Sequence, residues 1–133
     1  MAWRGLVRES SAEQADGWSP DRQRSDIRRA ADELGLVAAA DPLWYERVGS
    51  GEKTAVPELQ RALADGRAGQ YQVLVVLATS RFARNVTEAR IVKRDFAAAG
   101  LAIYFVNDRI VSGARSSRLT EGIREVLDEE ENE

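Results

Sequence analysis

Val73-Leu74-Val75-Val76-Leu77 is an unbroken run of β-branched and leucine side chains in the middle of the chain. A strand with one face in water alternates apolar and polar residues, whereas a strand covered on both faces need not. The run therefore predicts a central strand of a parallel sheet. Residues 101–106 form a second run of this kind, and residues 5–7 and 43–45 are shorter candidate strands.

Helical patterns separate these runs. Ser19 is a favourable N-cap, and Pro20 suits the first position of a helix. The other helices begin at a proline or a capping residue and end near a glycine or at the end of the chain. The expected helices span residues 19–35, 57–66 or 57–69, 85–100 and 117–133.

The elements therefore alternate from strand to helix four times. Alternation of this kind predicts an α/β fold, a three-layer sandwich in which helices cover both faces of a mostly parallel sheet of four to five strands. We expect one domain over residues 1–133, since this length suits a single core. Trp3, Trp18 and Trp44 are expected to be packing residues.

The composition excludes several kinds of chemistry. The chain has no cysteine and no histidine, so it holds neither a Ser-His-Asp triad nor a His- or Cys-ligated metal, and we expect no cofactor. The net charge is -3, but residues 128–133 carry five acids and the rest is near neutral. Bulk charge alone would not hold DNA. Without a signal peptide or membrane-length apolar run, a cytoplasmic protein is expected.

Two polar segments follow predicted strands, at the carboxyl edge where α/β sheets bind ligands. Arg8-Glu9-Ser10-Ser11, with Gln14 shortly after, is a candidate nucleophile segment, although a polar loop with turn-capping serines explains it too. Ser80-Arg81-Phe82-Ala83-Arg84 places two arginines before a helix N-terminus, which favours a phosphate, although a solvated basic turn is an alternative. A third segment, with Glu46 and Ser50-Gly51, is by itself a connector.

In this order, the segments resemble the catalytic domain of serine recombinases, the family of resolvases, DNA invertases and large phage integrases. That family opens with aromatic-x-Arg-x-Ser-Ser/Thr-x-x-Gln, matched by residues 6–14, and a helix near a second glutamine, here Gln23. An acidic residue with Ser-Gly follows, and then Asp/Ser-Arg-x-x-Arg, matched by residues 80–84. A strand with an acidic turn, matched by residues 100–108, ends the series, so the resemblance covers nearly the whole chain.

The resemblance implies site-specific DNA recombination by phosphoryl transfer. Ser10 would attack the scissile phosphate and expel a 3′-hydroxyl, leaving a covalent 5′-phosphoserine link. Arg8, Arg81 and Arg84 would surround the phosphate, since preorganised guanidinium groups stabilise its added negative charge without a metal. Supporting or positioning roles would fall to Gln14, Glu46, Ser50 and Ser80.

Three positions depart from the family pattern. Val56 precedes Pro57 where the family has arginine, and the loss of one charge-stabilising donor lowers a rate on the order of 10²–10³-fold. Leu6 replaces the aromatic residue, and Glu9 places a negative charge beside the phosphate site. A catalytically impaired member, acting as a dimerisation or regulatory module on the same fold, is therefore an alternative function.

The resemblance also implies partners. Double-stranded DNA would be the substrate, with a homodimer, and a tetramer in the synaptic complex of the full-length protein. In the family the last helix is long, drives dimerisation and leads to a DNA-binding part; here residues 117–133 would begin it, and we expect no DNA-binding domain. An unrelated α/β domain is a further alternative, although the chain lacks the glycine-rich loop or clustered N-terminal aspartates of phosphate-binding or response-regulator-like folds.

Overall fold

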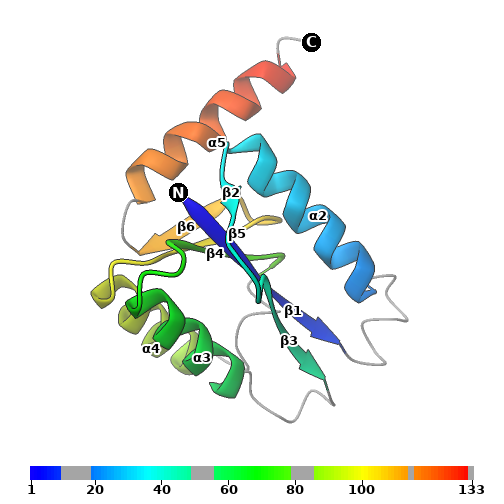
Figure 1. The fold of residues 1–133 in the computed structure, drawn as a ribbon. Helices are drawn as coiled ribbons and strands as arrows, with labels where there is room; N and C mark the ends of the chain where they lie inside the picture. The colour runs from blue at the N-terminus through cyan, green and yellow to red at the C-terminus, as the bar shows by residue number, and fades with distance from the viewer. Residues whose placement is uncertain (10–18, 49–55, 79–85, 114–115, 132–133) are drawn as a thin grey trace.

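The computed structural model describes residues 1–9, 19–48, 56–78, 86–113 and 116–131, which build one sheet with helices on both of its faces (Figure 1). The elements in chain order are β1 (Ala2–Glu9), α2 (Pro20–Glu33), β2 (Val37–Ala38), β3 (Trp44–Val48), α3 (Val56–Arg67), β4 (Val73–Val76), α4 (Val86–Ala98), β5 (Ala102–Phe105), β6 (Ile110–Gly113) and α5 (Ser116–Glu131).

The sheet is parallel except at one edge. Its six strands run in the order β2-β1-β4-β5-β6, with β3 also paired to β1. β2 pairs with the first residues of β1 and β3 with the last five, so the two short strands follow each other along one side of β1. β4 lies on the other side of β1, β5 lies beside β4, and β6 is antiparallel to β5.

Two apolar cores lie on opposite faces of the sheet. α2 and α5 pack on one face and α3 and α4 on the other (Figure 1). All residues of β4 and β5 are buried, as expected for strands covered on both sides. The first core includes Trp3, Val7, Ile27, Ala31, Val75, Leu119 and Ile123, and the second includes Leu6, Leu59, Leu74, Val76, Phe96 and Phe105.

The predicted fold class is confirmed, although the sheet has six strands where four to five were expected; β2 and β6 match none of the predicted strands. β2 has only two residues, and the antiparallel β6 begins at the exposed Ile110, so neither carries the apolar run of a buried strand. β1 is longer than its predicted apolar core because it includes Arg4 and Arg8. None of the described helices has the length and apolar character needed to cross a membrane.

Trp3 and Trp44 pack against each other, as predicted. Their rings meet edge to face with centroids 5.4 Å apart. The contact requires a glycine in β1, because a Cβ atom at Gly5 would lie 2.3 Å from the Trp44 ring. Trp18 lies outside the described residues.

Candidate functional site

Three parallel strands end toward one edge of the sheet, with β4 three residues shorter there than β1 and β3. Leu6 of β1 is level with Val76 of β4, and Glu9 at the end of β1 is level with Val48 at the end of β3. Since all three strands are parallel, the segments that follow them leave the sheet at the same edge. These segments carry residues 10–18, 49–55 and 79–85, which contain most of the predicted site.

Most predicted site residues lie outside the described part of the chain. They are Ser10, Gln14, Ser50, Ser80, Arg81 and Arg84, so their convergence on one phosphate stays a prediction. Arg8 is placed as a backbone position of β1, level with Arg47 of β3. Val56 is the first residue of α3. Glu46 is the predicted site residue whose side-chain contacts are described.

The Glu46 carboxylate is held by an arginine that the sequence analysis missed. Arg24 of α2 donates a hydrogen bond from Nη2 to Glu46 Oε1, and its Nη1 donates to Asp21 Oδ1 at 2.9 Å. Arg24 is 27% exposed and Glu46 is 44% exposed, so the ion pair is partly in water. The hydrogen bond to Glu46 raises the pKa of Arg24 above its ordinary value. Glu46 is therefore an ion-paired carboxylate that shares Arg24 with Asp21.

Local structure explains why these two side chains meet. Successive residues of a strand point to opposite faces, and Tyr45 belongs to the core under α3 and α4. Glu46 therefore faces α2, as does Trp44, which packs against the first core. α2 starts close to this edge, with Ser19 as its N-cap accepting a hydrogen bond from the Arg22 backbone N–H at 3.3 Å. Arg24 is in the second turn of the helix and reaches β3.

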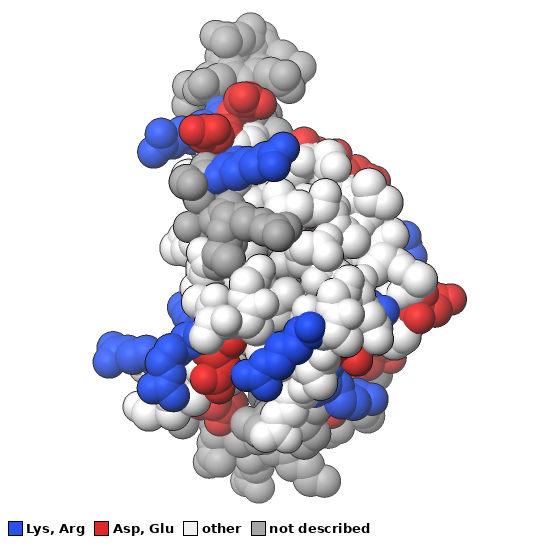
Figure 2. Space-filling view, turned by 60° about the vertical axis from the view of Figure 1, so that its left-hand side comes forward, with Lys and Arg blue, Asp and Glu red and all other residues white. Residues whose placement is uncertain are grey.

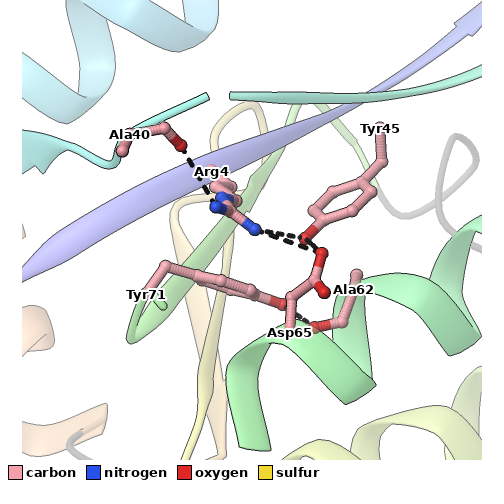
Figure 3. Close-up of polar contacts among 6 residues, drawn as sticks. All are labelled: Arg4, Ala40, Tyr45, Ala62, Asp65 and Tyr71. Carbon is pink, nitrogen blue, oxygen red and sulfur yellow. Dashed lines mark hydrogen bonds and ion pairs between the residues drawn. The ribbon is translucent and has the colours of Figure 1, made fainter. Parts of the chain in front are cut away.

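A second arginine is buried on the opposite face of the sheet (Figure 3). Arg4 is 2% exposed; its Nη1 donates to Tyr45 Oη at 2.9 Å and to Asp65 Oδ2 at 3.1 Å. Its Nη2 donates to the Ala40 carbonyl at 3.1 Å. Tyr45 Oη in turn donates to Asp65 Oδ2 at 2.6 Å. The guanidinium carbon lies 5.6 Å from the centre of the Tyr71 ring.

This network binds elements of the protein to one another. Burial, with Asp65 as hydrogen-bond acceptor, raises the pKa of Tyr45 to about 12 although Arg4 opposes the shift. Burial also raises the pKa of Tyr71, whose hydroxyl donates to the Ala62 carbonyl at 2.6 Å. Arg4 Nε has no partner in the described part of the chain. The network joins β1, β3 and α3 through hydrogen bonds among Arg4, Tyr45 and Asp65.

The outer surface of α3 and α4 carries side chains of both signs (Figure 2). A groove of about 510 Å³ lies between the two helices, and its walls are mainly apolar. It is lined by Leu59, Gln60, Leu63, Thr87, Glu88, Ile91, Val92, Asp95 and Phe96. None of these residues belongs to the predicted site, and acids outnumber bases along the groove. The groove therefore does not have the basic character of a phosphate-binding surface.

The described fold defines a class of protein: a three-layer α/β domain with a mostly parallel sheet, a class that usually binds ligands beyond the carboxyl ends of its strands. The chain belongs to the family Resolvase, N terminal domain, which matches residues 4–133. This match confirms the resemblance to serine recombinases. No curated protein sequence gives a significant match.

Several solved structures share the fold of this chain. The N-terminal catalytic domain of TP901-1 integrase superposes with a TM-score of 0.71 at 24% identity, covering 99% of this chain and 98% of that one. A resolvase family site-specific recombinase from Streptococcus pneumoniae gives 0.69 at 20% identity, covering 99% and 89%. The C-terminal catalytic domain of ISC1926 TnpA, an IS607-like serine recombinase, gives 0.64 at 18% identity, covering 80% and 70%. At these identities the likeness shows the fold alone.

Proposed function

We propose that this domain cleaves and rejoins DNA strands in site-specific recombination, with Ser10 as the nucleophile. The observation that supports this most is the adjacency of β1 and β4. The segment with Ser10 follows β1 and the segment with Arg81 and Arg84 follows β4, so both come after parallel neighbours that point to the same edge of the sheet. Family membership adds to this support, because the matched family contains resolvases.

The reaction is a pair of phosphoryl transfers. Ser10 Oγ loses its proton and bonds to phosphorus, while the bond to the 3′-oxygen breaks and that oxygen takes up a proton. The product is a 5′-phosphoserine link that conserves the energy of the broken ester. A 3′-hydroxyl then attacks the link, forms the new strand and restores Ser10. Arg8, Arg81 and Arg84 stabilise the charge on the phosphate in both steps.

The remaining assignments follow the same family pattern. Gln14, Glu46, Ser50 and Ser80 support or position the site, and no metal or cofactor takes part. Double-stranded DNA is the substrate, and α5 is the start of the helix that forms a homodimer, which pairs into a tetramer in the synaptic complex of the full-length protein. The domain covers residues 1–133 and acts in the cytoplasm.

An impaired member of the family is the second candidate function. Val56 stands where the family has an arginine, and Glu9 adds a negative charge next to Ser10. Either change weakens the stabilisation of a phosphate that gains negative charge. In that case the fold would serve as a dimerisation or regulatory module, and Ser10 would have no chemical role.

The test is the trapping of a covalent protein–DNA adduct. Wild type, Ser10→Ala and the neighbouring control Ser11→Ala are incubated with end-labelled duplexes of random sequence and separated on denaturing gels. We expect an adduct for wild type and Ser11→Ala, none for Ser10→Ala, and phosphoserine at residue 10 by mass spectrometry. An adduct that survives in Ser10→Ala contradicts the proposal.

Val56→Arg separates the two candidate functions. Restoring the missing guanidinium should raise the rate of adduct formation on the order of 10²–10³-fold if the chain is an enzyme weakened at this position. If neither wild type nor Val56→Arg forms an adduct, the dimerisation or regulatory module is favoured over the recombinase.

A further inference from the structure

The Arg24–Glu46 bridge lies next to the predicted phosphate site. Glu46 is level with Val7 of β1, two residues before the strand ends at Glu9, and Ser10 follows directly. A free carboxylate at this place would repel a DNA phosphate. We propose that Arg24 is a positioning residue for recombination, which neutralises Glu46 and holds it against α2 so that DNA can approach the edge. The inference rests on the proposed function.

The contacts of Arg24 argue against a direct role on phosphate. A guanidinium offers its two terminal nitrogens to carboxylates or phosphates in a fork. In Arg24, Nη1 is bonded to Asp21 and Nη2 to Glu46. Asp21 is three residues earlier on the same helix, so this bond fixes the direction of the arginine side chain. In this orientation the Nη2 atom of Arg24 donates its hydrogen bond to Glu46 of β3.

The three bonded side chains carry so little net charge that the loss of one arginine changes the charge that a DNA phosphate would meet. Asp21, Arg24 and Glu46 together carry one net negative charge, and without Arg24 they would carry two. Screening at physiological salt leaves interactions within about 8 Å significant. At this range an uncompensated carboxylate in partly aqueous surroundings lowers the affinity for a phosphate on the order of tenfold.

The other arginines of α2 make different contacts. Arg28 lies over the Trp44 ring, with 5.5 Å from its guanidinium carbon to the ring centre. Arg29 bonds Asp26 of its own helix at 2.8 Å and is well exposed. Arg29 therefore has the same charge and a similar helical partner as Arg24 but no bond to the described side chains of β3, and Arg29→Gln is a matched control.

The experiment is a double-mutant cycle on DNA affinity and adduct formation. Arg24→Gln, Arg24→Lys, Glu46→Gln, the double variant and Arg29→Gln are titrated with a fluorescent random-sequence duplex at two salt concentrations. Arg24→Gln should weaken binding on the order of tenfold at low salt, and less at high salt. In the Glu46→Gln background the same substitution should have at least about a fivefold smaller effect. Arg24→Lys should restore most of the affinity, and Arg29→Gln should match wild type.

The kinetic readout distinguishes positioning from chemistry. With adduct formation as the assay, Arg24→Gln should raise the DNA concentration for half-maximal rate more than it lowers the maximal rate. The inference is overturned if Arg24→Gln binds DNA as wild type does, or if its loss is equal in the Glu46→Gln background. The binding titration needs no cleavage. A missing adduct therefore counts against the proposed function, and uncoupled binding counts against the role of Arg24.

Discussion

Two arginine–carboxylate bridges lie on opposite faces of the same strand pair. Arg4 and Asp65 join β1 to α3 in the core, and Arg24 and Glu46 join α2 to β3 at the edge. Arg4 is 2% exposed, has two further hydrogen-bond acceptors and lies near two tyrosine rings. Arg24 is 27% exposed, and its two terminal nitrogens are bonded to the carboxylates of Asp21 and Glu46. The same chemical pair thus occurs in two different environments.

Solvent determines what each bridge contributes. In a buried pair, removal of one partner leaves a charge that water cannot reach, so the loss is large even where the intact pair adds little. In a half-exposed pair, water replaces the lost partner and the net effect is small. We therefore expect the buried bridge to control stability, and the edge bridge to control the charge that an approaching anion meets.

Removal of Asp65, the 31% exposed carboxylate that pairs with the buried guanidinium of Arg4, should have the largest effect. Asp65→Ala leaves Arg4 without its ion-pair partner and Tyr45 without its acceptor, and we expect a loss of about 3–5 kcal/mol in unfolding free energy. Urea denaturation of the full chain measures it. The double variant Arg4→Met with Asp65→Leu should recover much of the loss, because it removes the stranded charge. If Asp65→Ala alone lowers the unfolding free energy by less than about 1 kcal/mol, water must reach the unpaired Arg4 guanidinium in the variant.

The buried bridge should also make stability depend on alkaline pH. The pKa of Tyr45 is raised to about 12 in the folded chain, above its ordinary value of 10.0. Its contribution to stability is complete below pH 10 and is lost as pH rises toward 12, because the unfolded chain gives up the proton first. The slope is at most about 1.4 kcal/mol per pH unit for this tyrosine.

Tyr45→Phe is the control for this dependence. It should unfold with a shallower decline in stability between pH 10 and 12 than wild type, measured by denaturant titration at each pH. Part of the decline in stability that remains in Tyr45→Phe comes from Tyr71 and Tyr104, whose pKa values are also raised by burial. An identical pH profile for wild type and Tyr45→Phe would contradict the raised pKa.

The sequence predicted the layers of the fold because apolar periodicity reports burial directly. Residues 73–77 and 101–106 read as doubly covered strands, and both β4 and β5 are fully buried. β2 could not be found in this way, because both of its residues are exposed and pair with β1 only at its start. β6 was missed because an antiparallel edge strand need not carry a continuous apolar run.

The sequence was enough to predict the family and to propose site residues, but it did not show which side chains contact one another. The order of motifs identified the family and the carboxyl edge, and it named Glu46. No local pattern shows that Arg24 reaches Glu46, because the partners are 22 residues apart in sequence. Arg4 could have been noticed as a charge inside an apolar strand, which requires a buried partner. Its partner Asp65 is 61 residues away, and only the fold brings them together.

The smallest expected effect on stability is also the one that separates the two bridges most sharply. Arg24→Gln removes a half-exposed ion pair, so the unfolding free energy should change by no more than about 1 kcal/mol. The change should shrink further at high salt, because exposed charges are screened. Urea denaturation at two salt concentrations, with Arg29→Gln as control, measures it. A loss comparable to that of Asp65→Ala would mean that the edge bridge holds α2 onto the sheet, and weaker DNA binding by the variant would then reflect a damaged fold. A small loss together with reduced DNA affinity assigns Arg24 to the charge of the site, since the folded domain is then intact while the anion meets one carboxylate more.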